Sequence, residues 1–357
     1  MKKNFLITTG GSGGHVIPAI ILYKHLSNVA NIIISTDKRG LRFFNNDNFT
    51  LEIINTPKLN NILFLPLNII IIFILTLRSF FLIKNKKIEK VFCTGGYMSL
   101  PLILASKLLN LKIYLIEPNH VLGRANKFFL NSCEKIFCYT KDIKNFPSKF
   151  RDKIVTIYPL VREQTYKLEV SKKKKEEFTL LIVGGSQGAS IFDKNLKNLI
   201  VEISKKESIR IIQQTNNKNI VDLNNFYKKN NVKNEIFSFE KNFINYVLRA
   251  DLCISRAGAS TLAELSVLNI PFIAVPLPTS KDNHQYENAN FYMIKNCCWV
   301  VEQNQFDEKI EKILKDIFFD KSDYFKKMEN LRKLNINNSW INVNQKILET
   351  INENKNC

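Results

Sequence analysis

The sequence predicts an α/β protein made of two similar halves, each with a parallel sheet covered by helices. An apolar strand, a glycine-rich turn and an amphipathic helix follow one another at residues 4–26, and the same order restarts at residues 178–203. Short apolar runs continue this alternation through both halves, and 357 residues suffice for two domains of ordinary size. We expect domains at residues 1–160 and 161–335, followed by a last helix within residues 336–357.

The first glycine-rich turn spans Thr9–Pro18 and follows the strand at residues 4–8. Apolar residues recur after it at helical spacing, so the turn leads into a helix N-terminus. The backbone N–H groups and partial positive charge of such a terminus suit a phosphate or another anion. His15 is the residue of this turn that can perform acid–base chemistry near neutral pH. The alternative is an ordinary tight turn in which His15 caps the helix.

Composition narrows the partners and the cellular compartment. The net charge of +20 favours an anionic partner such as a phosphate, a nucleic acid or an acidic lipid surface, although solvated lysine-rich faces would give the same count. No nucleic-acid-binding motif accompanies this charge, so we expect no nucleic-acid partner. The seven cysteines include no C-x-x-C pair, which argues against a zinc site and fits a reducing cytoplasm. The apolar run Phe5–Ile7 is too short for a signal peptide.

The most apolar stretch of the chain is Ile62–Ile83, in which Arg78 is the single charged residue. As a helix it would be long enough to cross a bilayer. The interpretation that we favour is a helix lying partly in an anionic membrane surface, with a simple buried helix and a transmembrane helix as the alternatives. Four lysines follow the stretch and would meet anionic head groups: Lys84, Lys86, Lys87 and Lys90. A single crossing would separate the first glycine turn from the next one, which disfavours a transmembrane helix.

The ends of two later strands in the first half carry further candidate residues. The strand at residues 91–93 runs into Thr94–Tyr97, and the strand at residues 113–116 ends in Glu117 and Asn119. Loops that follow the carboxyl ends of parallel strands line the ligand crevice. Tyr97, Glu117 and Asn119 are therefore expected to converge on the His15 turn, unless they serve only as caps or turn residues.

The second half contains its own set of polar residues behind strands. The turn Gly184–Ala189 matches neither a dinucleotide-binding fingerprint nor a Walker A loop. After the strand at residues 252–255, Ser260 and Thr261 lie at a helix start that suits a diphosphate, and the Glu264 carboxylate could accept both ribose hydroxyls. No D-x-D triplet is present, so we expect no obligatory metal.

Together these motifs resemble one glycosyltransferase family over essentially the whole chain. The set comprises Gly10–His15 with Pro18, Thr94–Tyr97 with Pro101, Glu117–Asn119, Gly184–Ala189, Arg256–Thr261 with Glu264, and Asp282–Gln285 with Asn288 and Ala289. It is similar to the peptidoglycan enzymes that add N-acetylglucosamine to a lipid-linked muramyl-pentapeptide. The resemblance implies the GT-B architecture, two Rossmann-like domains facing across a cleft, with the last helix packing back towards the first domain. It also implies that the first domain binds the acceptor and the membrane and that the second binds the UDP-sugar.

The resemblance also implies roles for particular residues. Contacts to the donor UDP-N-acetylglucosamine are implied for Ser12, Gly13, Gly14, Asn119, Arg162, Ser186, Glu240, Phe243, Ala259, Ser260, Thr261, Leu262, Ala263, Glu264 and Gln285. Contacts to the acceptor are implied for Gly10, Gly11, Gly95, Gly96 and Tyr97. Two positions depart from the family pattern, because Tyr158–Val161 replaces the usual Gly-Asn-Pro before Arg162, and Glu240 occupies a uracil position that is often apolar.

The implied reaction is an inverting transfer in one displacement. The acceptor's 4-hydroxyl attacks the anomeric carbon while UDP leaves, with His15 as the base and Glu117 orienting or replacing it. The implied setting is the cytoplasmic face of the plasma membrane, where cell-wall synthesis and division proteins are expected partners. Three alternatives remain: a diacylglycerol glycosyltransferase, a UDP-N-acetylglucosamine 2-epimerase, and a non-catalytic protein that binds a nucleotide-sugar or a membrane surface.

Overall fold

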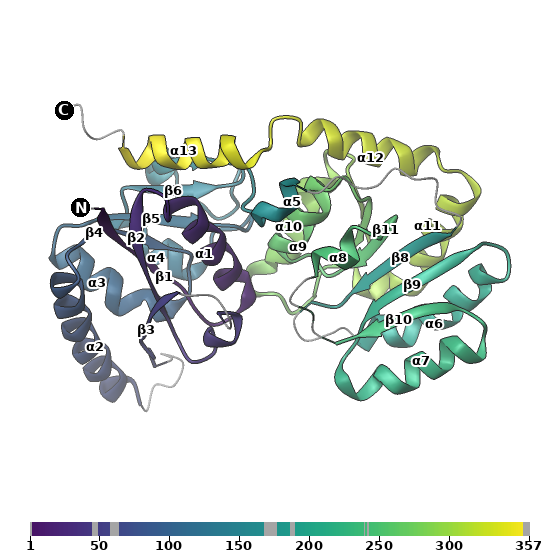
Figure 1. The fold of residues 1–357 in the computed structure, drawn as a ribbon, viewed down its shortest axis with the longest axis horizontal. Coiled ribbons are helices and arrows are strands. Elements are labelled where there is room, and N and C mark those ends of the chain that lie inside the picture. Colours follow the sequence, from purple (N-terminus) through teal and green to yellow (C-terminus); the bar gives the residue numbers. More distant parts are fainter. Residues whose placement is uncertain are drawn as a thin grey trace. The chain divides into compact units, whose positions relative to one another are not determined.

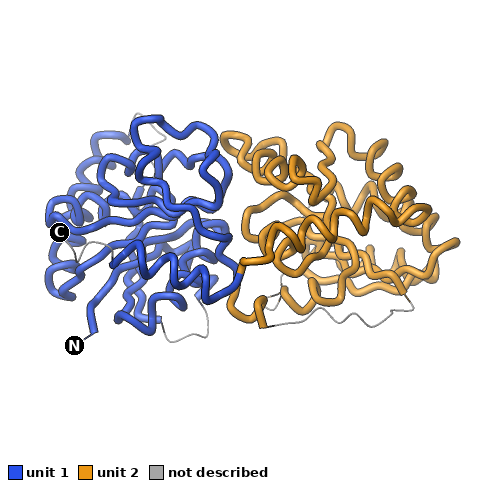
Figure 2. Tube along the Cα trace, turned by 90° about the horizontal axis from the view of Figure 1, so that it is seen from above, with its two compact units in different colours: residues 1–161, 339–357 blue, residues 162–338 orange. Residues whose placement is uncertain are grey.

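The computed structural model describes residues 2–44, 49–57, 64–167, 177–185, 190–238, 240 and 243–352. The chain divides into two compact units, unit 1 with residues 1–161 and 339–357 and unit 2 with residues 162–338 (Figure 2). The chain returns from unit 2 to unit 1 between residues 338 and 339, three residues beyond the boundary expected at 335/336. Each unit contains one parallel sheet flanked by helices, which confirms the predicted α/β class (Figure 1).

The sheet of unit 1 has seven strands among the described residues, in the order β3-β2-β1-β4-β5-β6-β7. Its strands are β1 (Lys3–Thr8), β2 (Ala30–Thr36), β3 (Thr50–Ile53), β4 (Ile88–Cys93), β5 (Lys112–Glu117), β6 (Lys135–Cys138) and β7 (Ile154–Thr156). Its helices are α1 (Gly13–Leu26), α2 (Leu65–Asn85), α3 (Leu100–Leu108), α4 (Arg124–Phe129) and α13 (Trp340–Asn352). Every pairing within this sheet is parallel, so the carboxyl ends of its strands share one edge.

The sheet of unit 2 has six described strands, in the order β10-β9-β8-β11-β12-β13. Its strands are β8 (Phe178–Val183), β9 (Ile209–Gln214), β10 (Lys233–Phe237), β11 (Leu252–Ser255), β12 (Phe272–Ala274) and β13 (Trp299–Val300). Its helices are α5 (Glu163–Lys167), α6 (Ser190–Ser204), α7 (Ile220–Lys229), α8 (Ile244–Val247), α9 (Ala259–Val267), α10 (His284–Met293), α11 (Phe306–Phe319) and α12 (Ser322–Leu334).

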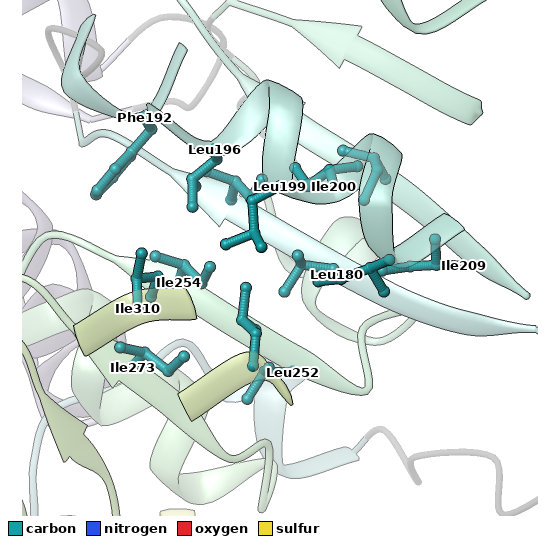
Figure 3. Close-up of a cluster of buried hydrophobic side chains, with 14 of the residues drawn as sticks. Leu180, Phe192, Leu196, Leu199, Ile200, Ile209, Leu252, Ile254, Ile273 and Ile310 are labelled. Carbon is teal, nitrogen blue, oxygen red and sulfur yellow. The ribbon is translucent and has the colours of Figure 1, made fainter. Parts of the chain in front are cut away.

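The central strands are continuous apolar runs because both of their faces are buried. Side chains alternate across a strand, so Leu180 and Ile182 of β8 pack into one hydrophobic cluster while Leu181 and Val183 pack into another. Figure 3 shows Leu180 within the first of these clusters, together with side chains from α6, β11, β12 and α11. The same alternation operates in β1 of unit 1. These cores fix the strand ends that carry the candidate site residues.

The last helix, α13, belongs to unit 1 although it follows unit 2 in the chain. The Trp340 ring stacks on the His25 ring of α1 with centroids 3.6 Å apart, and Val343 and Ile347 enter the same core. The Lys90 ammonium donates a hydrogen bond to the Ile351 carbonyl near the helix C-terminus. Lys90 therefore helps to hold α13, which corrects the expectation that it faces lipid head groups.

Helix α2 contains the described part of the predicted apolar stretch, whereas Ile62 and Leu63 lie outside the described residues. Its buried residues are Ile72, Thr76, Ser79 and Ile83, and α2 packs beside α3 (Figure 1). The buried hydroxyls of Thr76 and Ser79 donate to the carbonyls four residues earlier, which satisfies them within the helix. The alternative of a simple buried helix is wrong, because much of α2 is exposed.

The exposed side of α2 is apolar. It carries Leu67, Ile69, Ile70, Phe73, Ile74, Leu77 and Phe81, each at least 44% exposed, and we call this set the apolar face of α2. Among the described residues, α2 is the one helix long and apolar enough to cross a membrane by length and composition. Exposed apolar surfaces of this extent are typical of sites that contact a lipid or a protein.

Candidate active site

The carboxyl edge of the unit 1 sheet gathers the loops that follow β1, β2, β4 and β5. The Thr9 N–H donates to the Ser35 carbonyl, and the Thr94 N–H donates to the Thr8 carbonyl, so hydrogen bonds join three of these strand ends. The hydroxyls of Thr94 and Thr9 lie 2.8 Å apart in a further hydrogen bond. This network holds the first glycine turn in register with the Gly95–Gly96 turn.

His15 lies at the start of α1, and its orientation is fixed by the residue that follows β4. Its Nδ1 lies 2.8 Å from the Thr94 carbonyl oxygen. Because a carbonyl oxygen only accepts hydrogen bonds, the neutral ring carries its proton on Nδ1 and presents Nε2 with a lone pair. A neutral imidazole with an unprotonated nitrogen can act as a general base.

Gly95 lies directly beside the His15 ring. Its φ is +95°, and a Cβ built there would lie 3.0 Å from both Cε1 and Nδ1 of His15. An L-residue at this position would therefore be strained and would displace the imidazole from the Thr94 carbonyl.

Substituting Gly95→Ala should accordingly lower both stability and turnover. The positive φ alone costs about 1–2 kcal/mol, and the contact with His15 adds to that cost. The matched control is Gly185→Ala, because Gly185 has φ +80° but no described atom lies within 4 Å of the position that its Cβ would take. Urea unfolding should show a larger loss for Gly95→Ala than for the control, and equal losses would contradict the close packing against His15.

Glu117 ends β5 and is 1% exposed. Its Oε1 accepts the backbone N–H and the side-chain amide of Asn119, both at 3.1 Å. Its Oε2 accepts the Gly123 N–H at 2.8 Å and the Asn126 amide at 2.9 Å. Burial raises the pKa of this carboxyl, while the four donors act in the opposite direction. Glu117 thus fixes Asn119 and Asn126, so its contacts favour a positioning role, and its predicted catalytic role stays a prediction.

Asp37 and Arg39 form a second cluster beside the first glycine turn. The Asp37 carboxylate follows β2 and accepts the Gly11 N–H at 2.8 Å and the Gly40 N–H at 3.0 Å. Those two N–H groups share Asp37 Oδ1, whereas Oδ2 accepts a hydrogen bond from Arg39 Nε at 2.8 Å. Arg39 Nη2 in turn donates to the Tyr97 hydroxyl at 2.9 Å. Sequence reasoning missed Asp37 and Arg39, although Asp37 satisfies the same rule that selected Glu117, namely a polar residue at a strand's carboxyl end.

In unit 2, Glu264 of α9 is buried against Arg162. Arg162 Nη1 lies 2.5 Å from Glu264 Oε1, and the side chains are 26% and 4% exposed. Burial raises the pKa of the Glu264 carboxyl, and the Arg162 guanidinium counteracts part of that rise. The structure thus brings together two residues that sequence reasoning had placed around the donor. A ribose bound at Glu264 would have to share this carboxylate with Arg162 or replace it.

The other predicted residues of α9 divide by burial. Leu262 and Ala263 are buried, so their side chains face the core and only their backbone is left for a ligand. Ser260 and Thr261 are half-buried in the first turn, where backbone N–H groups lack helical partners. No acidic residue lies in that first turn, which leaves its positive end available for a phosphate. Ser186, the other predicted diphosphate ligand, lies outside the described residues.

Gln285 at the start of α10 is oriented by the segment that follows β12. Its Oε1 accepts the Leu277 N–H at 3.0 Å, which leaves the amide Nε2 as a donor for a ligand. Next to it lies a hollow of ≈ 380 Å³ lined by Leu277, Asn283, Tyr286 and Gln303, among others. Arg256, which follows β11, donates to the Pro276 carbonyl and to Gln303, and so ties the two sides of this hollow together.

The predicted uracil residues lie between β10 and α8. Glu240 is half-buried, and Phe243 precedes α8 and packs against the core cluster around Leu262. Within the described residues, no group of three or more His, Cys, Asp or Glu side chains is placed to hold a metal ion. The expected independence from metal stays a prediction.

Two sequence-family models match the chain in tandem. The glycosyltransferase family 28 N-terminal domain matches residues 5–138, and the glycosyltransferase family 28 C-terminal domain matches residues 179–340. A protein of Pelagibacter ubique is 46% identical over 99% of this chain and 100% of its own length. Its name is UDP-N-acetylglucosamine--N-acetylmuramyl-(pentapeptide) pyrophosphoryl-undecaprenol N-acetylglucosamine transferase. A Rickettsia felis protein of the same name is 34% identical over 87% of this chain and 90% of its own length.

Solved structures share the fold at lower identity. MurG of Acinetobacter baumannii superposes with a TM-score of 0.78 at 20% identity, covering 99% of this chain and 100% of that one. The UDP-GlcNAc 2-epimerase of Neisseria meningitidis gives 0.68 at 15% identity, covering 98% and 100%. Because a transferase and an epimerase share this architecture, the fold alone does not choose between the two activities.

Proposed function

The chain belongs to glycosyltransferase family 28, and we propose that it transfers N-acetylglucosamine from UDP-N-acetylglucosamine to a lipid-linked N-acetylmuramoyl-pentapeptide. The observation that carries the proposal is the full-length likeness to the Pelagibacter transferase, which includes both units and their loops. The acceptor is bound by unit 1 and the donor by unit 2. This step completes the lipid-linked precursor of peptidoglycan at the cytoplasmic face of the plasma membrane.

The proposed chemistry is a single displacement with inversion. The acceptor's 4-hydroxyl oxygen forms a bond to the anomeric carbon while the bond from that carbon to the UDP oxygen breaks. His15 Nε2 takes the hydroxyl proton, and the hydrogen bond from Nδ1 to the Thr94 carbonyl stabilises the imidazolium that forms. The leaving diphosphate gains negative charge, which the first turn of α9 and Arg162 offset.

The donor is held by residues of unit 2. Glu264 binds the ribose hydroxyls, Ser260 and Thr261 bind the diphosphate, and the Gln285 amide donates to the sugar hydroxyls. Two features support these assignments: the burial of the Glu264 carboxylate and the fixed orientation of Gln285 by the Leu277 N–H. Glu240 and Phe243 flank the uracil, where a backbone contact at Glu240 avoids placing its carboxylate against the base.

The decisive assay combines radiolabelled UDP-N-acetylglucosamine with a synthetic lipid-linked muramyl-pentapeptide. We expect a labelled lipid product and one equivalent of UDP, both undiminished by EDTA. Formation of UDP-N-acetylmannosamine without any acceptor would instead identify a 2-epimerase. Transfer to diacylglycerol in place of the muramyl lipid would identify the related lipid glycosyltransferase. Absence of UDP release would indicate a non-catalytic binding protein.

We also propose that the apolar face of α2 rests in an anionic membrane surface. Its seven exposed apolar side chains support this, as do Arg78, Lys84, Lys86 and Lys87, which are exposed on the same helix and just beyond it. Lysine and arginine beside an apolar surface attract anionic head groups, each contributing about 1 kcal/mol. A peripheral position would bring unit 1 to the membrane in which the lipid-linked acceptor resides.

Replacing Ile70, Phe73 and Ile74 together with serine should release the protein from anionic vesicles in a flotation assay. Each of these side chains is more than half exposed, so the change removes apolar contact with lipid and little core packing. Losing about 1.5 kcal/mol or more per side chain would weaken membrane binding at least tenfold. The control replaces Val221 and Phe319, exposed apolar residues of unit 2, and should float like the wild type. Undiminished flotation of the α2 variant would count against this surface.

A further inference from the structure

The cluster of Asp37, Arg39 and Tyr97 presents an oriented cation at the first glycine turn. A Cβ built on Gly11 would lie 3.7 Å from Arg39 Nη2, so the guanidinium lies against the turn itself. Two contacts fix its plane: Nε donates to Asp37 at 2.8 Å, and Nη2 donates to the Tyr97 hydroxyl at 2.9 Å. The Arg39 carbon Cζ also lies 5.6 Å from the centre of the Tyr97 ring.

The charges of this cluster are unevenly exposed. The Asp37 side chain is 7% exposed, and its carboxylate also accepts two backbone N–H groups, so its negative charge faces inward. The Arg39 side chain is 48% exposed. A guanidinium carries five N–H donors, of which the two described contacts use two. The Arg39 guanidinium is therefore the exposed partner of this ion pair, and its remaining N–H groups have the fork geometry that matches phosphate oxygens.

We infer that Arg39 binds the pyrophosphate diester of the lipid-linked acceptor, with Asp37 and Tyr97 as its positioning residues. This inference rests on the proposed function, in which both substrates contain a diphosphate. Arg39 belongs to unit 1, which also carries the apolar face of α2, whereas unit 2 has its own polar groups for the donor. The acceptor's diphosphate is joined to a lipid, whereas the donor is soluble. A site in the unit that carries the apolar face of α2 therefore suits the acceptor's diphosphate better than the donor's.

The test compares Michaelis constants for the two substrates in Arg39→Gln. The acceptor KM should rise about 10- to 100-fold, the usual effect of losing a hydrogen bond between charged groups, while the donor KM stays at the wild-type value. Arg39→Lys should recover part of the loss, because it restores the charge without the planar fork. Tyr97→Phe, which removes one positioning contact but keeps the ring, should raise the acceptor KM less.

The matched control is Arg42→Gln, which removes a neighbouring cation that lies over the Phe43 ring. It should leave both KM values unchanged. If Arg42→Gln raised the acceptor KM as much as Arg39→Gln does, Arg39 would contribute only as part of the general surface charge, and the inference would be overturned. A rise confined to the donor KM would also overturn it, by assigning Arg39 to the donor's diphosphate.

Equilibrium binding separates this inference from the proposed function. A short-chain prenyl pyrophosphate diester, titrated in detergent micelles without any donor, should bind the wild type and bind Arg39→Gln at least tenfold more weakly. Loss of binding in the variant would support the inference even if the wild type transferred no sugar. Equal binding would refute it even if transfer proceeded, and matching thermal unfolding curves would show that the variant is folded.

Discussion

His15→Ala is expected to reduce turnover by about 10²- to 10⁴-fold, the usual contribution of a general base. The reason is the position of the ring: Nδ1 is committed to the Thr94 carbonyl at 2.8 Å, and Nε2 is the nitrogen able to accept a proton. Binding of UDP should be unaffected, because the residues proposed to hold its ribose and diphosphate, Glu264, Ser260 and Thr261, belong to unit 2. Single-turnover rates with both substrates and titration calorimetry with UDP measure the two quantities separately.

The pH profile provides a second readout for His15. In the wild type, protonation of the base should reduce turnover towards acid pH, and this decline should disappear from the residual activity of His15→Ala. The control is Lys315→Ala, which removes an exposed charge of unit 2 that pairs with Glu311. The control should retain most of the turnover. Unchanged turnover in His15→Ala would remove this residue from the mechanism.

Glu264→Gln is expected to weaken donor binding about 10- to 100-fold. The substitution keeps the side-chain volume but replaces a charged hydrogen-bond acceptor, and bonds to charged groups contribute about 1.5–3 kcal/mol. Calorimetry with UDP is the direct measurement. The control is Glu311→Gln, the same change at a carboxylate of unit 2 that is 47% exposed and pairs with Lys315. Exposed pairs contribute about 0–1 kcal/mol, so the control should bind UDP normally.

The ion pair with Arg162 adds a pH dependence of known sign. Arg162 lowers the pKa of the Glu264 carboxyl, which burial otherwise raises. Arg162→Gln should therefore raise that pKa further. Because the carboxylate is the form that accepts ribose hydroxyls, UDP affinity should be lost as pH falls through this pKa, and the loss should begin at a higher pH in Arg162→Gln than in the wild type. Identical pH profiles would contradict the expected influence of Arg162 on the Glu264 carboxyl during donor binding.

Local patterns were sufficient to predict most strands and the glycine turns. The run at residues 4–8 indicates a buried strand because every residue after Asn4 is apolar or small, and a turn of four glycines must end it. The same reasoning located Glu117 and Glu264. Strands β10 and β13 were not predicted, since β10 has no fully buried residue and β13 comprises two residues.

The sequence by itself determined the class of fold, the family and the chemistry-bearing residues that directly follow apolar strands. These signals are local, because the spacing of neighbouring apolar residues predicts which face of a strand or helix is buried. Only the tertiary structure decided which distant residues meet. Arg39 reaches Tyr97, 58 positions away, because β2 and β4 both pair with β1, and no periodicity encodes that order. Likewise the apolar run predicted a helix, but the packing of α2 beside α3, which buries Ile72, Thr76, Ser79 and Ile83, decided which face of α2 stays exposed.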